Sequence, residues 1–123
     1  MIQKTIQIFT KKEEELFHLL TGIGMKKNVA KLLVFLADKP EATSREIEHG
    51  TDLRQPEVSI AVKYMKEQGW IRNSNSSASG KGRPEKVFTL AKPMVKIVES
   101  IEKMRKGEIE SQLALIRKIR DFV

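Results

Sequence analysis

Cysteine is missing from the 123-residue chain. Its absence excludes disulfide bonds, thiolate zinc sites, iron–sulfur clusters and thiol redox sensing. Histidine is scarce, because only His18 and His49 are present, and they are too few and too far apart in sequence to indicate a metal site. We therefore expect neither a metal ion nor a cofactor.

The residue patterns that enzymes need are also missing. The segment Gly80-Lys81-Gly82 lacks the preceding glycine spacing and the following serine or threonine of a phosphate-binding loop. There is no cysteine nucleophile, and no credible set of serine, histidine and aspartate for nucleophilic catalysis. The sequence therefore argues against an enzyme.

Long apolar runs are absent as well. No stretch approaches the roughly 20 apolar residues that span a bilayer. The start, Met1-Ile2-Gln3-Lys4, is not followed by the apolar segment of a secretory signal. We expect a cytoplasmic protein that does not contact a membrane, with one core-forming domain and added helices.

What the sequence has in excess is positive charge, and this charge is concentrated. The chain carries a net charge of +7. Residues 54–96 contain nine Lys or Arg and three Asp or Glu, a net +6, whereas residues 1–53 contain eight of each sign. A focused basic region is typical of a protein with a polyanionic partner. The alternative is a solvated basic face with no partner.

Apolar residues at steps of three and four predict helices in the first half of the chain. The first follows Thr10 and ends at the glycines of residues 22–24, and the second covers about residues 25–37. A short third helix opens with Thr43-Ser44-Arg45-Glu46, which has the pattern of a capping box. Gly50 ends this helix or loosens its last turn.

A fourth helix is predicted to start near Pro56, with Gln55 at its cap, and to end at Gly69 in a left-handed conformation. Its inward stripe consists of Val58, Ala61, Val62 and Met65. We expect Trp70, which follows, to lie in the core.

The pattern changes after this helix. Residues 70–72 and 85–90 predict two strands, and the polar loop 73–82 lies between them, so we expect a β-hairpin with a long tip. The end of the chain is helical again, with Pro93 in the first turn. Gly107 marks a break or a kink, which leaves both one bent helix and two helices open.

Two helices joined by a tight turn at Thr51-Asp52-Leu53, and followed by a basic hairpin, are typical of a winged helix-turn-helix. The expected fold class is mainly α with a small β-hairpin, a winged helix-turn-helix domain with additional N- and C-terminal helices. We expect residues 1–24 to form an N-terminal helical arm and residues 25–91 the DNA-binding domain. Residues 92–123 would form the C-terminal dimerisation helix or helices.

A recognition helix enters the major groove, where every base pair presents its own pattern of donors and acceptors. The fourth helix has a polar outer face suited to such contacts, formed by Arg54, Gln55, Ser59 and Lys63. The hairpin tip, Gly80-Lys81-Gly82-Arg83-Pro84, adds a flexible backbone and two cations that suit phosphates or the minor groove.

Five segments carry a family resemblance through their order and spacing. They are Thr43-Ser44-Arg45-Glu46-Ile47, Leu53-Arg54-Gln55-Pro56-Glu57-Val58-Ser59, Gln68-Gly69-Trp70-Ile71, the hairpin tip and Val87-Phe88-Thr89-Leu90. Over about residues 25–91 the chain resembles the winged-helix regulators of the MarR, ArsR and TrmB-like groups, especially archaeal members. The resemblance implies a dimer, a recognition helix at 55–68 and a wing between 70 and 90. It implies DNA contacts at Arg54, Gln55, Pro56, Ser59, Ile60, Lys63, Lys81 and Arg83.

Two positions depart from the family pattern. Many relatives have a polar or basic residue where Ile60 stands, so Ile60 either contacts a thymine methyl group or packs within the protein, and we favour the contact. Glycine is common where Asp52 stands, and aspartate tolerates the left-handed conformation of such a turn.

The C-terminal segment has the residues for self-association. Ile109, Leu113, Ile116 and Val123 recur at steps of four, three and seven, which is close to the spacing of a coiled-coil seam. We therefore expect a homodimer that binds double-stranded DNA. The alternative is that this helix folds back over the apolar face of the first helix, and both hold if the two helices build the interface together.

A rival function is a winged-helix module that binds a protein or an RNA without operator specificity. The concentrated charge, the polar outer face of the fourth helix and the pair Lys81 and Arg83 favour DNA. A protein-binding version would expose more apolar residues on that helix, and only Ile60 fits this pattern.

Overall fold

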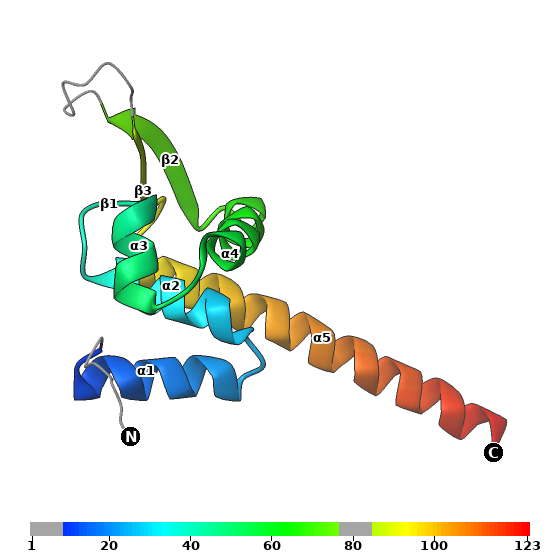
Figure 1. The fold of residues 1–123 in the computed structure, drawn as a ribbon. Coiled ribbons are helices and arrows are strands. Elements are labelled where there is room, and N and C mark those ends of the chain that lie inside the picture. Colours follow the sequence, from blue (N-terminus) through cyan, green and yellow to red (C-terminus); the bar gives the residue numbers. More distant parts are fainter. Residues whose placement is uncertain (1–8, 77–84) are drawn as a thin grey trace. The chain divides into compact units, whose positions relative to one another are not determined.

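The computed structural model describes residues 9–76 and 85–123 (Figure 1). The chain divides into two compact units, Met1–Ala91 and Lys92–Val123. The elements of the first unit are α1 (Lys11–Gly22), α2 (Lys27–Ala37), β1 (Ala42–Thr43), α3 (Ser44–Thr51), α4 (Gln55–Glu67), β2 (Ile71–Ser76) and β3 (Glu85–Leu90), and the second unit contains α5 (Met94–Phe122). Helices predominate and the strands form one antiparallel sheet, which confirms the predicted fold class.

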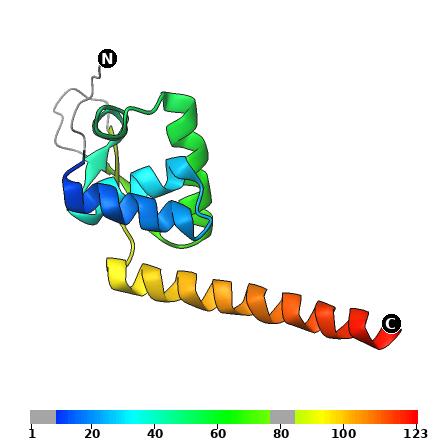
Figure 2. The same cartoon turned by 90° about the horizontal axis from the view of Figure 1, so that it is seen from below.

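Helix α1 is defined at both ends by local chemistry. At its start, the Glu13 backbone N–H donates to Thr10 Oγ1 (3.1 Å), and the Thr10 backbone N–H donates to Glu13 Oε1 (2.9 Å). These two bonds form a capping box. At its end, Gly24 adopts a φ of 102°, which a glycine tolerates without strain. The helix packs against α2 (Figure 2), and its buried residue is Leu20.

The core of the first unit is built around α2, which packs against α1, α3 and α4. Its predicted inward residues Val29, Leu32, Leu33 and Leu36 are all buried. Ala30 and Val34 are buried as well, because neighbouring helices cover more than one side of α2. Each fully buried leucine or valine contributes about 1.5–3 kcal/mol relative to exposure, so α2 is the main apolar support of the unit.

Helix α3 begins as predicted but ends differently. Its capping box is present, with Glu46 N–H donating to Thr43 Oγ1 and Thr43 N–H donating to Glu46 Oε1. Gly50 does not end the helix, which was one of the two predicted alternatives, because the helix continues to Thr51 and Asp52 caps it in the left-handed conformation (φ 59°). A Cβ at Gly50 would overlap the ring of Phe35 on α2. Gly50 therefore allows the close approach of α3 to α2.

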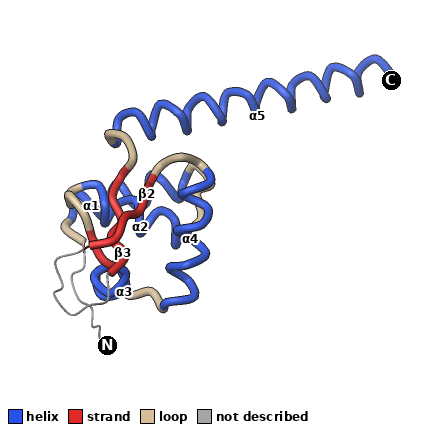
Figure 3. The backbone as a smooth tube through the Cα atoms, turned by 90° about the horizontal axis from the view of Figure 1, so that it is seen from above, coloured by secondary structure: helices blue, strands red, loops and turns tan. Residues whose placement is uncertain are grey.

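The sheet is larger than the predicted hairpin. Its strand order is β1-β3-β2, and the short strand β1, which the sequence did not predict, pairs Ala42 with Phe88. Strand β2 runs on to pair Ser76 with Glu85, so residues 73–76 are strand and not loop as predicted (Figure 3). Regular main-chain pairing with β3 outweighs the weak strand preference of their Asn and Ser side chains.

The second unit is one continuous helix of 29 residues, which answers the question of one helix or two. Pro93 is its N-cap and not part of its first turn. The helix passes through Gly107 without a break, and one ion pair spans this position while another ends directly before it. Arg105 Nη1 lies 2.7 Å from Glu108 Oε1, and Lys106 Nζ lies 3.4 Å from Glu102 Oε2. Among the described residues, no helix is both long and apolar enough to cross a membrane.

Candidate nucleic-acid interface

Helix α4 packs against α2 and α3 with one face and leaves the other face free. Its predicted inward stripe is confirmed, because Val58, Ala61, Val62 and Met65 are all buried. The five predicted contact residues on this helix are exposed, and they are Gln55, Pro56, Ser59, Ile60 and Lys63. The four inward side chains hold the helix, so the outer face is not needed for the core.

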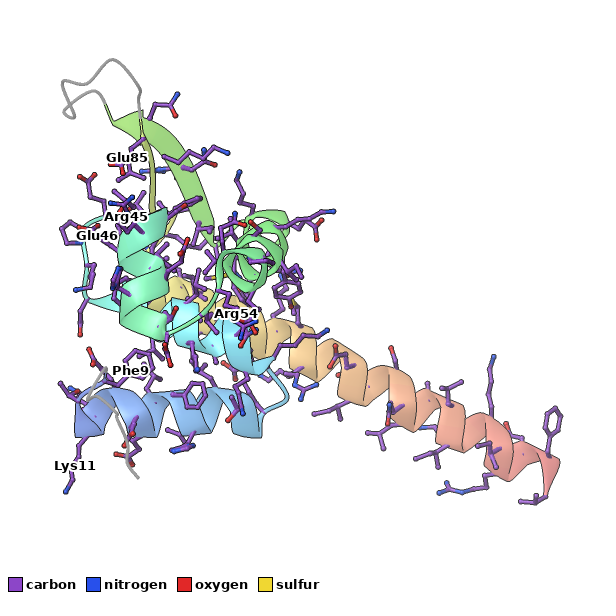
Figure 4. All side chains as sticks on the ribbon, in the orientation of Figure 1. Phe9, Lys11, Arg45, Glu46, Arg54 and Glu85 are labelled. Atoms are coloured by element: carbon purple, nitrogen blue, oxygen red, sulfur yellow. The ribbon has the colours of Figure 1, made fainter. Side chains whose placement is uncertain are left out.

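The helix starts one residue earlier than predicted. Arg54 is its N-cap, and Gln55, which was expected there, is the first helical residue. The Arg54 backbone N–H donates to Glu57 Oε1 over 2.9 Å. The Glu57 carboxylate is therefore engaged at the helix end, while the exposed Arg54 side chain extends from the same end (Figure 4).

Two of the predicted base-contacting side chains form a hydrogen bond with each other. Gln55 Nε2 donates a hydrogen bond to Ser59 Oγ, with 2.9 Å between the two atoms. The residues are four apart, so they lie on the same side of the helix, one turn after the other. This bond restricts the orientation of the Gln55 amide.

The end of α4 connects it rigidly to the wing. Gly69 has a φ of 78°, and the Trp70 backbone N–H donates to the Met65 carbonyl over 3.0 Å, which together form the predicted left-handed cap. Trp70 is buried, as predicted, and its ring meets that of Tyr64 edge to face at 5.8 Å. The Trp70 carbonyl accepts from the Ala91 N–H (2.7 Å), which joins the two ends of the hairpin.

A groove with a volume of about 440 Å³ lies between α4, the start of α3 and strand β3. Its lining residues are Ser44, Gln55, Val58, Ser59, Val62, Lys63, Lys66, Glu67, Lys86 and Phe88. Three of the four charged side chains are lysines. A concave surface with several cations and hydroxyl and amide donors suits a phosphate backbone.

The groove contains residues that the sequence did not single out as contacts, namely Ser44, Lys66 and Lys86. One signal for Lys66 was available, because it follows Lys63 by three residues on the same helix face. Lys86 precedes Phe88 by two residues and so lies on the same face of β3, but nothing in the sequence shows that this strand lies beside α4. Lys81 and Arg83, the predicted contacts at the wing tip, lie outside the described residues.

Helix α5 carries the predicted dimerisation residues. Ile109, Leu113 and Ile116 are exposed on this helix, with exposed fractions between 46% and 59%, and Val123 follows its last residue. Leu115 and Phe122 are also exposed apolar residues and were not predicted. In the parts of the chain that the structure covers, no group of three or more His, Asp or Glu side chains is placed to hold a metal ion.

Comparison with known proteins finds one family model that matches the part of the chain with this geometry. Residues 23–81 match the model of the MarR family. The match covers the helix-turn-helix and extends into the wing. No curated protein matches the chain significantly.

Solved structures share the fold at low sequence identity. A protein described as a possible transcriptional regulator from Methanosarcina mazei Go1 has a TM-score of 0.64 and 13% identity, over 85% of this chain and 86% of that one. A MarR family transcriptional regulator from Silicibacter pomeroyi DSS has a TM-score of 0.54 and 17% identity, over 81% of this chain and 64% of that one. ZitR from Lactococcus lactis has a TM-score of 0.52 and 16% identity, over 89% of this chain and 84% of that one.

The family match and the shared fold agree with the local geometry of α3, α4 and the wing. The MarR family consists of transcriptional regulators, which bind DNA and are not enzymes. Residues 23–81 of this chain match the MarR family of winged-helix transcriptional regulators.

Proposed function

We propose that this protein binds specific sequences of double-stranded DNA as a homodimer, with α4 in the major groove and the wing on the backbone or in the minor groove. The observation that carries the proposal is the groove in which the polar face of α4 meets three lysines from α4 and β3. The match of residues 23–81 to a family of DNA-binding regulators supports it independently.

Base contacts would come from the first half of α4. The N-terminal residues of a recognition helix are those closest to the base edges. Gln55 and Ser59 carry the donors and acceptors there, and Pro56 and Ile60 add apolar surface. Ile60 is 73% exposed, so it does not pack in the core, which supports the thymine-methyl contact over the packing alternative.

Phosphate contacts would surround these residues. Lys63, Lys66 and Lys86 line the groove, and Arg54 extends from the start of α4. Ser44 lies in the first turn of α3, where backbone N–H groups favour an anion. We retain Lys81 and Arg83 as contacts of the wing tip, since they are the cations between β2 and β3.

The second copy of the chain would bind along α5. Ile109, Leu113 and Ile116 form one exposed stripe, and Leu115, Ile119 and Phe122 form a second stripe beside it. Together the two stripes are wider than the narrow seam of a two-stranded coiled coil, so more than one helix of the partner would cover them. We propose a second copy of this chain as the partner of α5, because two-fold symmetry doubles the number of DNA contacts that one small DNA-binding domain can make.

Selection of bound duplexes from a random-sequence pool tests the proposal. The full chain should enrich one sequence with two half-sites related by two-fold symmetry and centred about 10 base pairs, or a multiple of this, apart. Enrichment of a single half-site would contradict the dimer. Retention of the pool without any enriched sequence would contradict specific DNA binding.

The rival function, binding of a protein or RNA, rests on the exposed Ile60 and Tyr64 of α4. Binding measurements with the same protein preparation distinguish DNA binding from this rival function. A regulator of DNA should bind the enriched duplex more tightly than an RNA duplex of the same sequence, whose deep, narrow major groove does not admit a helix. Tighter binding of the RNA would favour the rival.

A further inference from the structure

The hydrogen bond between Gln55 and Ser59 determines which atoms of the amide are left for DNA. Both side chains are exposed, and both line the groove beside α4. Gln55 Nε2 donates one of its two hydrogens to Ser59 Oγ. One N–H donor and the Oε1 acceptor of the same amide remain, side by side.

We infer that Gln55 contacts an adenine in each half-site, and that Ser59 is a positioning residue that orients the Gln55 amide for it. This inference rests on the proposed function, because it names the base that the recognition helix selects. In the major groove, adenine presents an N7 acceptor beside an N6 donor. The free N–H of Gln55 matches N7, and Oε1 matches the N6 amino group.

The other bases do not offer this pair. Guanine presents two acceptors, O6 and N7, so Oε1 of Gln55 would face O6 without a hydrogen between them. Cytosine offers only a donor at this edge, and thymine only an acceptor and its methyl group. An amide held in this orientation therefore discriminates most directly against guanine.

Ser59 is needed because the side-chain amide of a glutamine without a hydrogen-bond partner can rotate by half a turn. With the amide rotated by half a turn, Nε2 would face O6 of guanine and could donate a hydrogen bond to it. The rotated amide would accept the Ser59 hydrogen at Oε1 instead, so only the observed orientation leaves that hydrogen for a contact with DNA, and such a contact opposes the rotation. The Ser59 hydroxyl keeps its own hydrogen for a phosphate or a second base.

Selection from a random duplex pool with full-length variants tests the assignment of the base. The unmodified chain should enrich a motif with an invariant adenine in each half-site, and Gln55→Glu should change that one position to cytosine, because a carboxylate only accepts hydrogen bonds. The matched control is Asn28→Asp, which makes the same change from amide to carboxylate in the first turn of α2, outside the groove lining. It should enrich the original motif.

Equilibrium binding to the enriched duplex tests the role of Ser59. Replacing the adenine by guanine, with its paired thymine by cytosine, should weaken binding of the unmodified chain roughly 5- to 100-fold. Ser59→Ala should bind the adenine duplex more weakly than the unmodified chain, because it loses the contact of its own hydroxyl, and it should also lose most of the discrimination between the adenine and guanine duplexes. Ser59→Thr, which restores a hydroxyl, should recover it.

The results separate this inference from the proposed function. A specific motif that Gln55→Glu leaves unchanged would overturn the adenine contact while leaving DNA binding intact. Unchanged discrimination in Ser59→Ala would overturn the positioning role. A pool without any enriched motif would overturn both this inference and the proposed function.

Discussion

Helices α4 and α5 are both amphipathic, but they leave opposite kinds of surface exposed. Helix α4 buries four of its 13 residues, and its exposed face is polar or charged apart from Pro56, Ile60 and Tyr64. On α5, every residue from Glu102 onward is exposed, and this stretch includes two apolar stripes. The first helix is complete within its own unit, whereas the second has no partner in its unit.

The exposed surfaces of α4 and α5 therefore suit different kinds of partner. A polar, lysine-bordered face matches base edges and phosphates, which offer hydrogen-bond groups and negative charge. An exposed apolar stripe is unfavourable in water and matches another apolar helix. DNA contact and self-association are therefore expected to depend on separate residues, and variants of one helix should leave the other property intact.

The largest expected effect comes from α5. Leu113→Glu together with Ile116→Glu should produce a folded monomer that binds the enriched duplex about 10²-fold more weakly, since two linked half-site contacts become one. Sedimentation and DNA titration measure both changes. Ala114→Glu with Lys118→Gln changes the net charge of the helix equally but leaves both apolar stripes intact, so this variant should remain dimeric. A dimeric double-glutamate variant would contradict the assignment of α5.

Two helical glycines, one in the packed unit and one in α5, differ in the space around them. Gly50→Ala should lower the free energy of unfolding by about 1–3 kcal/mol, because the new methyl group overlaps the Phe35 ring. Gly107→Ala meets no atom within 4 Å and should raise helix stability by up to about 1 kcal/mol. Urea unfolding of both variants measures the difference. Equal effects of the two substitutions would show that Phe35 does not restrict position 50.

Variants of the wing test how much its positive charge contributes to DNA affinity. Lys81→Ala with Arg83→Ala should weaken binding to duplex DNA roughly tenfold, and should flatten the slope of log affinity against log salt by about 1.8, or 0.9 per lost phosphate contact. Titrations at several salt concentrations give this slope. Lys103→Ala with Lys106→Ala removes the same charge from α5 and should leave the slope nearly unchanged. Equal slopes for the wing variant and the unmodified chain would contradict the wing contacts.

The smallest expected effect concerns the exposed isoleucine of α4. Replacing the contacted thymine by uracil removes one methyl group, and this should weaken binding about fourfold. In Ile60→Ala the same replacement should have almost no effect, because the apolar partner is gone. A loss of the same size in both proteins would show that Ile60 does not contact the methyl group.

Local chemistry made several features predictable from sequence. The capping box at Thr43 and Glu46, the left-handed positions Asp52 and Gly69, and the inward stripe of α4 depend on residues close together in the chain. Their spacing therefore carries the information directly. The family resemblance was predictable for the same reason, because it rests on short segments in order.

Features that depend on distant residues were not predictable in the same way. Gly50 was misinterpreted because its reason lies in Phe35, on another helix. Residues 73–76 were taken as loop because their composition is polar, whereas pairing with β3 makes them strand. Lys86 was missed as part of the groove because only the fold brings β3 beside α4.

The affinity ratio between the enriched duplex and the same duplex with both half-sites scrambled measures whether the polar face of α4 selects a sequence. We predict that the full chain at physiological salt prefers the intact duplex at least about 10³-fold, as expected for specific operators. The preference should persist when salt lowers both affinities, because base contacts and not charge produce it. Equal affinities for the two duplexes would contradict the account that the polar face of α4 selects a sequence.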